Sequence, residues 1–120
     1  MNIGKNIMKV HSKNNPGKLK AFVDIDETIC FYKNERIYEH AIPSYENIKK
    51  INKLYDAGNT IVYWTARGSG SGIDWSEVTG NQLTRWGAKH HDYKVGKPTY
   101  DLFICDKAVN SQDFFTRTTR

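Results

Sequence analysis

The ten residues LKAFVDIDET, positions 19–28, decide the fold of this sequence and direct the search for its site. The segment from Leu19 to Asp24 is short, apolar and carries a β-branched residue, which predicts a buried strand. Asp26 follows Asp24 after a single intervening residue. Because side chains two apart on an extended backbone point the same way, we predict that both carboxylates project into one crevice. Such neighbours repel unless a cation lies between them or one carboxylate takes up a proton.

Further strands are predicted along the chain. Residues 60–65 (TIVYWT) are dense in residues that favour sheets, and residues 100–105 (YDLFIC) predict another clear strand. Residues 89–93 predict a shorter one. The segments 29–32 and 36–39 predict a small hairpin.

Helices are predicted between these strands and at the end of the chain. They run from the N-cap Ser44 to Gly58, from Asp74 or Ser76 to Trp86, and over residues 108–115. The order strand, helix, strand, helix, strand predicts an α/β fold with a parallel sheet and right-handed crossovers. Ligands bind such sheets at the carboxyl ends of the strands.

Polar residues stand at the ends or entries of the other predicted strands. They are Thr65-Ala66-Arg67-Gly68, Gly96-Lys97-Pro98 and Cys105-Asp106. A carboxylate can attack phosphorus and form an acyl phosphate, and a second acid can move the protons. Magnesium prefers hard oxygen ligands, while hydroxyl and ammonium groups can hold phosphoryl oxygens. Together these groups predict phosphoryl transfer.

The net charge of +5 arises at one end of the chain. The first twenty residues contain five Lys and no acid, whereas the remainder has 13 basic and 13 acidic residues. We therefore predict a basic flexible arm over residues 1–18 and one domain over residues 19–120. No apolar run approaches the ~20 residues that span a bilayer. The lack of a secretory signal and the presence of only two cysteines favour a soluble cytoplasmic protein.

The ordered motifs resemble the haloacid dehalogenase superfamily, whose phosphatases carry Asp-x-Asp-x-Thr, then Thr or Ser, then Lys, then an acidic pair. Here they are DIDET at residues 24–28, Thr65, Lys97 and Cys105-Asp106. The chain looks most like small members connected with capsule and lipopolysaccharide sugar synthesis. The resemblance implies a Rossmann-like parallel sheet with flanking helices and a squiggle and flap between Thr28 and about His40. It also implies that no cap domain is present.

The resemblance also implies a role for each site residue. Asp24 would be the nucleophile that forms an aspartyl phosphate, and Asp26 the general acid and base. Thr65 and Lys97 would bind the phosphoryl group. Magnesium would be held by Asp24, the backbone carbonyl of Asp26, and Asp106.

Contacts to substrate are expected from Thr28, Arg67 and Gly68, with Arg67 near the leaving group. The loop of residues 68–72, with Asp74 and Trp75, is a further candidate for substrate contact. The implied activity is a magnesium-dependent phosphomonoester hydrolase acting on a small sugar phosphate. Because a site without a cap is open, a homo-oligomer whose neighbours complete the pocket is expected.

One position departs from the resemblance, and alternatives remain open. Cys105 stands where close relatives carry an acid, and a soft thiolate is a poor magnesium ligand. Asp106 satisfies the motif if its second position is the direct ligand. One alternative is a phosphatase of protein or polynucleotide ends, with the basic arm binding an acidic polymer, although nucleic acid is not the favoured partner. The other is a catalytically weakened interaction module on the same fold.

Overall fold

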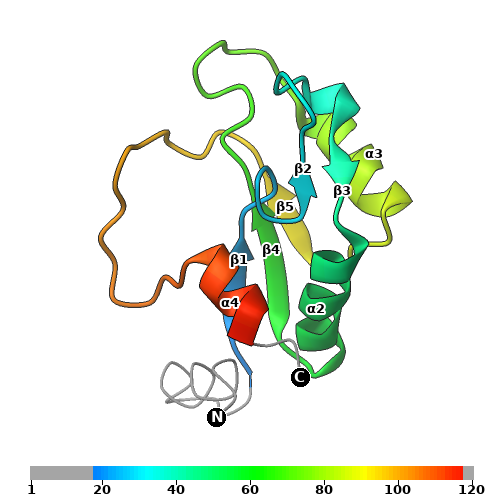
Figure 1. Cartoon of the computed structure of the whole chain (residues 1–120), viewed down its shortest axis with the longest axis vertical. Helices are drawn as coiled ribbons and strands as arrows, with labels where there is room; N and C mark the ends of the chain where they lie inside the picture. The colour runs from blue at the N-terminus through cyan, green and yellow to red at the C-terminus, as the bar shows by residue number, and fades with distance from the viewer. Residues whose placement is uncertain (1–17, 118–120) are drawn as a thin grey trace.

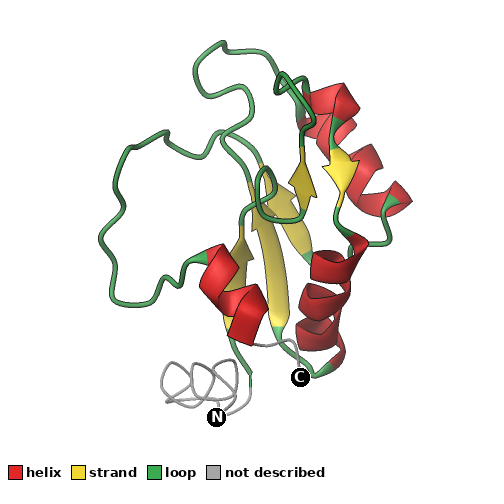
Figure 2. Cartoon of the chain, viewed as in Figure 1, coloured by secondary structure: helices red, strands yellow, loops and turns green. Residues whose placement is uncertain are grey.

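The computed structural model describes residues 18–117, while residues 1–17 and 118–120 lie outside the described part. The basic arm predicted for residues 1–18 is therefore outside it, except for Lys18. Short strands at the centre of the molecule are flanked by helices, and a long loop extends to one side (Figures 1 and 2). Within residues 18–117, no helix has the length and apolar character needed to cross a bilayer.

A parallel sheet with the strand order β1-β4-β5 lies at the centre of the fold. Its strands are β1 (Lys20–Val23), β4 (Thr60–Trp64) and β5 (Asp92–Lys94). Aromatic and β-branched residues dominate β4, as expected of the central strand of a sheet. The α/β fold with a parallel sheet is thus confirmed. The short strand predicted at residues 89–93 lies at 92–94.

A two-stranded sheet replaces the predicted hairpin. β2 (Cys30–Phe31) pairs antiparallel with β3 (Ile42–Pro43), and the predicted partner segment 36–39 instead runs into a 3-10 helix, η1 (Tyr38–His40). The Ser44 N–H donates to the Ile29 carbonyl at 2.8 Å, which extends this pairing up to the N-cap of the next helix. Residues 32–41 therefore form a longer loop than predicted.

Helices flank the sheet as predicted, with small shifts in their bounds. They are α2 (Tyr45–Asp56), α3 (Ser76–Arg85) and α4 (Ser111–Arg117). Ser44 is the N-cap of α2, since its Oγ accepts from the Asn47 N–H at 3.3 Å. Gly58 and Gly87 follow α2 and α3 with φ of 97° and 70°, a conformation that glycine adopts without a Cβ clash.

The core lies between one face of the sheet and these helices. Its members include Val23, Ile61 and Tyr63 from the sheet, Ile48 and Ile51 from α2, Leu83 from α3 and Phe115 from α4. Burial of each large aliphatic side chain contributes about 1.5–3 kcal/mol to the stability of the fold. Phe22, which points to the other face of the sheet, stays 50% exposed.

The prediction of a strand at residues 100–105 is wrong. Residues 95–110 belong to no helix or strand and run as a long loop from β5 to α4 (Figure 1). Leu102 and Ile104 are 75% and 87% exposed. An apolar segment forms a strand only where a neighbouring strand supplies its hydrogen bonds. Here the left-handed turn at Gly96 and the missing N–H of Pro98 lead the chain out of the sheet.

Candidate active site

Polar residues gather at the carboxyl ends of the parallel strands, where the predicted topology places a ligand site. Asp24 directly follows β1 and Thr65 directly follows β4. Lys97 comes three residues after β5, and its N–H donates to the Thr65 carbonyl at 3.0 Å. The backbone of the Lys97 turn is therefore tied to the end of the central strand.

Lys97 and Asp24 are in contact, although 73 residues separate them in the sequence. The Lys97 ammonium donates to Asp24 Oδ1. The Asp24 side chain is 44% exposed, whereas that of Lys97 is 12% exposed. Burial alone would lower the pKa of Lys97, but the hydrogen bond and the charge of Asp24 outweigh it and raise the pKa above its ordinary value. A cation therefore lies beside an accessible carboxylate.

Aromatic rings border the Lys97 ammonium. Its Nζ lies 5.7 Å from the ring centroid of Trp64 and 5.3 Å from that of Tyr100. The faces of such rings attract cations. The Ser69 hydroxyl donates to the Lys97 carbonyl at 2.6 Å and so holds the backbone of Lys97 in place. Together these contacts limit the positions that the ammonium can take.

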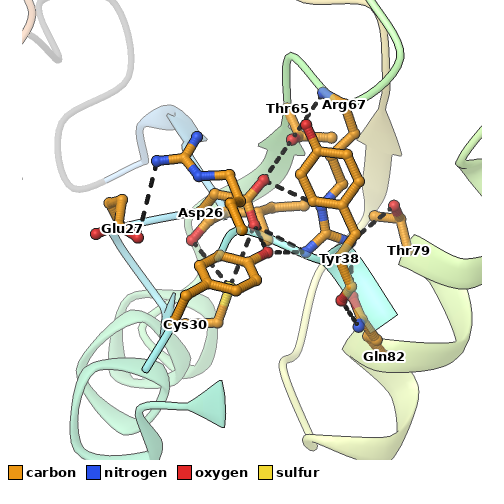
Figure 3. Close-up of polar contacts among 11 residues, drawn as sticks. Asp26, Glu27, Cys30, Tyr38, Thr65, Arg67, Thr79 and Gln82 are labelled. Carbon is orange, nitrogen blue, oxygen red and sulfur yellow. Dashed lines mark hydrogen bonds and ion pairs between the residues drawn. The ribbon is translucent and has the colours of Figure 1, made fainter. Parts of the chain in front are cut away.

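Asp26 belongs to a second ion pair, with Arg67, that is buried (Figure 3). Arg67 Nε donates to Asp26 Oδ2 at 3.0 Å, and Nη2 donates to Oδ1 at 2.9 Å. The Tyr32 hydroxyl donates to Oδ1 at 2.5 Å, and the Thr65 hydroxyl to Oδ2 at 3.4 Å. Bidentate charge-assisted pairs fix both partners in orientation. The Asp26 carboxylate is therefore held in one position.

Arg67 uses every guanidinium nitrogen within the protein. The residue is 1% exposed, and its Nη1 donates to Thr79 Oγ1 at 3.1 Å and Gln82 Oε1 at 2.6 Å, both on α3. The guanidinium carbon lies 4.9 Å from the ring centroid of Tyr38. The substrate contact predicted for Arg67 is not supported by this arrangement, because its N–H groups hold Asp26 and α3.

The charge state of Asp26 follows from this cluster. Burial alone would raise the pKa of Asp26, but the hydrogen bonds and charge of Arg67, with donors from Tyr32 and Cys30, hold it below its ordinary value. Asp26 is thus a carboxylate that can accept a proton. Burial and the charge of Asp26 raise the pKa of the Cys30 thiol to about 12, so Cys30 stays neutral beside Asp26 Oδ1, at 3.5 Å.

A tight turn after β1 directs the two carboxylates to these separate cations. Glu27 adopts φ 63°, in the left-handed region that residues with a Cβ rarely enter. The Glu27 N–H donates to the Cys30 carbonyl at 2.9 Å, and the Ile29 N–H donates to the Ile25 carbonyl at 2.9 Å. As a result Asp24 contacts Lys97, whereas Asp26 contacts Arg67.

Thr28 and Gly68, both predicted to contact substrate, have local structural roles. Thr28 is buried, and its carbonyl accepts from Asn47 Nδ2 at 3.0 Å. Gly68 has φ 82°, and an added Cβ would come within 2.1 Å of the Ile73 carbonyl oxygen, so only glycine fits this turn. Substrate contact by Thr28 or Gly68 stays a prediction.

Asp106 is not brought together with the other predicted metal ligands. It lies with Cys105 on the exposed loop of residues 95–110. The described residues contain no group of three or more His, Cys, Asp or Glu side chains that could hold a metal ion. The carboxylates of Asp24 and Asp26 are engaged by Lys97 and Arg67. This arrangement does not fit the magnesium site that the resemblance implies.

Three residues of the site were missed by the sequence analysis. Thr79 and Gln82 are polar residues three apart on the buried face of α3. Buried polar side chains need partners, but the burial of these two residues is visible only in the structure. Tyr32 gave no signal either, because its contact with Asp26 depends on the path of the 32–41 loop.

Comparisons with known proteins support the fold but indicate no activity. No family model matches the sequence, and no curated protein matches it. A crystal structure of a target protein from Vibrio cholerae is similar, with a TM-score of 0.70 and 26% sequence identity. The similarity covers 81% of this chain and 87% of that chain. The description of that protein names no activity, so the likeness supports the α/β architecture alone.

Proposed function

We propose that this chain is a phosphomonoester hydrolase in which the Asp24 carboxylate attacks phosphorus and forms an aspartyl phosphate. The observation that carries the proposal is the contact between Asp24 and Lys97 at the carboxyl edge of the sheet. Asp24 is accessible to a substrate, and the ammonium beside it can neutralise phosphoryl oxygens. Catalysis of phosphoryl transfer depends mainly on such positioning and charge stabilisation.

The reaction proceeds in two displacements. First an Asp24 oxygen bonds to phosphorus while the bond from phosphorus to the leaving oxygen breaks, and the leaving oxygen takes up a proton. Water then attacks the phosphorus of the acyl phosphate, which releases inorganic phosphate and restores the Asp24 carboxylate. Lys97 and the Thr65 hydroxyl stabilise the phosphoryl oxygens in both steps. Because Asp26 rests as a carboxylate, it first takes up a proton from solvent and gives it to the leaving oxygen, and then accepts the proton of the attacking water.

A requirement for magnesium is a separate proposal, supported by the resemblance of the motifs. Since the described arrangement does not fit the ion, no step above passes through it. A site made of Asp24, the Asp26 carbonyl and Asp106 requires the loop of residues 95–110 to approach the edge of the sheet.

We also propose a substrate class, an assembly and a location. The substrate is a small phosphorylated metabolite such as a sugar phosphate, the chain forms a homo-oligomer, and it is located in the cytoplasm. Exposed apolar side chains support an oligomer. They are Phe22, Phe103, Leu102 and Ile104, with exposures from 50% to 87%. Light scattering tests the oligomer, and the mass of a single chain across the micromolar range contradicts it.

The experiment that tests the activity compares the wild type with Asp24→Asn on a panel of phosphomonoesters, with and without magnesium. Asp56→Asn, an exposed carboxylate at the end of α2, is the matched control. We expect turnover in the wild type and in Asp56→Asn, and none in Asp24→Asn. Acid quench should trap a phosphorylated wild-type chain that hydroxylamine cleaves. Turnover that survives in Asp24→Asn excludes the mechanism, and an inert wild type favours the interaction module.

A further inference from the structure

The two oxygens of the Asp26 carboxylate differ in the donors that they accept from. Oδ1 accepts from Arg67 Nη2 at 2.9 Å, from the Tyr32 hydroxyl at 2.5 Å and from the Cys30 thiol at 3.5 Å. Oδ2 accepts from Arg67 Nε at 3.0 Å, and its second donor, the Thr65 hydroxyl, is more distant at 3.4 Å (Figure 3). A carboxylate offers about four lone-pair positions, shared between its two oxygens. Oδ1 is therefore fully occupied, whereas Oδ2 has one weakly engaged position.

The distant donor on Oδ2 can be withdrawn. It belongs to Thr65, which directly follows β4 and whose hydroxyl oxygen accepts from the Arg67 N–H at 3.3 Å. A hydroxyl has a single proton to donate. When Thr65 donates it to a phosphoryl oxygen, as in the proposed function on which this inference rests, Oδ2 loses this donor. Binding of the phosphoryl group thus opens Oδ2 to the leaving oxygen.

The donor from Tyr32 on Oδ1 is held more firmly. Burial and the hydrogen bond to Asp26 raise the pKa of the Tyr32 hydroxyl above its ordinary value, so this hydroxyl stays a donor at neutral pH. Its oxygen also accepts from Arg67 Nη2 at 3.4 Å. The Tyr32 hydroxyl is therefore bound on both sides within the cluster, and it keeps Oδ1 closed.

Tyr32 also makes the two oxygens inequivalent, which Arg67 does not. Arg67 donates one short hydrogen bond to each oxygen, whereas Tyr32, which directly follows β2, donates to Oδ1 alone. A general acid must lie within hydrogen-bond reach of its target, and a displacement of about 1 Å can cost about 10²-fold in rate. We propose that Tyr32 is a positioning residue, whose hydroxyl closes Oδ1 of Asp26 and holds Oδ2 where the leaving oxygen takes its proton.

Both proton transfers then use the same oxygen. Oδ2 takes up a proton from solvent and gives it to the leaving oxygen as the bond between phosphorus and that oxygen breaks. In the second displacement Oδ2 accepts the proton of the attacking water as the water oxygen bonds to phosphorus, and this proton returns to solvent. Tyr32 keeps its own proton throughout.

The test separates protonation of the leaving group from the other work of the site. A hexose 6-phosphate releases an alkoxide that needs a proton, whereas 4-nitrophenyl phosphate releases a phenolate that is stable without one. The readout is the ratio of kcat/KM for the first substrate to kcat/KM for the second. Tyr32→Phe should lower this ratio about tenfold or more, because a misplaced general acid loses much of its effect.

Tyr93→Phe is the matched control. Tyr93 is also half-buried, and its hydroxyl donates to the Ser76 carbonyl at 3.2 Å. The variant therefore loses one hydrogen bond, as Tyr32→Phe does, without touching Asp26, and it should leave the ratio within twofold. An equal fall in kcat/KM for both substrates in Tyr32→Phe leaves the ratio unchanged, which assigns Tyr32 a structural role and overturns the proposal. A raised ratio overturns it as well, because proton transfer then proceeds better through Oδ1.

Two further measurements distinguish this proposal from the proposed function. Asp26→Asn should lower the ratio at least as far as Tyr32→Phe, and a wild-type ratio in Asp26→Asn overturns both. A wild type that hydrolyses neither substrate contradicts the proposed function, and NMR then decides the position of Tyr32. The Arg67 Nε–H proton, which is donated to Oδ2, should exchange with solvent about tenfold faster in Tyr32→Phe than in the wild type or Tyr93→Phe, because Oδ1 is no longer held. Equal exchange rates overturn the positioning role.

Discussion

The Arg67 guanidinium holds both carboxylate oxygens of Asp26, at 2.9 and 3.0 Å, across 41 residues of sequence. This pair joins the turn after β1 to the loop after β4. Through Thr79 and Gln82, the same guanidinium also joins both to α3. The side chains of the pair are 0% and 9% exposed, so the contact is a buried link between these elements.

Replacing one partner of this pair should destabilise the protein strongly. Arg67→Met leaves the Asp26 carboxylate buried without its cation, which should lower the free energy of unfolding by about 3–5 kcal/mol, measured in urea. Lys89→Met breaks the exposed Lys89–Asp56 pair and should cost under about 1 kcal/mol. The double variant Asp26→Leu/Arg67→Met should lose less than the two single losses combined. Equal costs for Arg67→Met and Lys89→Met would show that the buried pair is not a structural link.

Removal of the Lys97 ammonium should impair phosphoryl transfer while a neighbouring lysine is dispensable. Lys97→Met should lower kcat/KM for a phosphomonoester by about 10²–10³-fold, because the charge on the phosphoryl oxygens loses its stabilising cation. Inorganic phosphate should also inhibit this variant more weakly. Lys94→Met, on an exposed position of β5, is the control and should behave as wild type. Equal kcat/KM values for the two variants would show that Lys97 has no role in phosphoryl transfer.

Much of the sheet and one half of the site could be predicted from local patterns. The apolar runs before Asp24 and Thr65 define their own strands, and the parallel topology places their ends at one edge. The strand ends were predicted because short-range sequence and a general rule of sheet topology suffice for them. Lys97 was expected at the entry to the absent strand of residues 100–105, and it reaches the edge instead because the turn after β5 returns to Thr65.

The rest depended on contacts that local patterns do not encode. Residues 100–105 read as a strand, yet a strand exists only with a partner, and the structure supplies none for Leu102 or Ile104. The resemblance of the motifs implied a substrate contact for Arg67 near the leaving group. Only the positions of Thr79 and Gln82 on α3 show that Arg67 is buried.

The left-handed backbone at Glu27 predicts an unusual response to glycine. Glu27→Gly should be more stable than Glu27→Ala by about 1 kcal/mol, because alanine at φ 63° keeps a Cβ that glycine lacks. Both variants lose the exposed Arg36 pair equally. In the middle of α2, Lys49→Gly should be less stable than Lys49→Ala by about 1 kcal/mol, the opposite sign. If urea unfolding gives the same sign for the stability difference between the glycine and alanine variants at both positions, the left-handed backbone at Glu27 is contradicted.

The two cysteines should differ sharply in reactivity. Cys30 is 0% exposed with a raised pKa, whereas Cys105 is exposed. Because the thiolate is the reactive form, a thiol reagent at neutral pH should label about one equivalent quickly and the second only on unfolding. Cys105→Ser should remove the fast phase. Two fast equivalents in the native wild type would show that Cys30 is not enclosed by the turn after β1.

The magnesium requirement proposed for this chain should act through the loop of residues 95–110. Asp106→Asn should raise the half-saturating magnesium concentration about tenfold or more, as expected for loss of a carboxylate at a metal site. Asp101→Asn, which changes an exposed carboxylate in the same loop, is the control and should leave the half-saturating magnesium concentration unchanged.

Labelling of Cys105 should slow when magnesium and a phosphate mimic are added together, because the loop must then approach Asp24. If instead Cys105→Asp lowers the half-saturating concentration and Asp106→Asn leaves it unchanged, the first position of the pair holds the ion. The thiol at residue 105 is then what weakens the site, because a soft sulfur ligand replaces the oxygen that magnesium prefers.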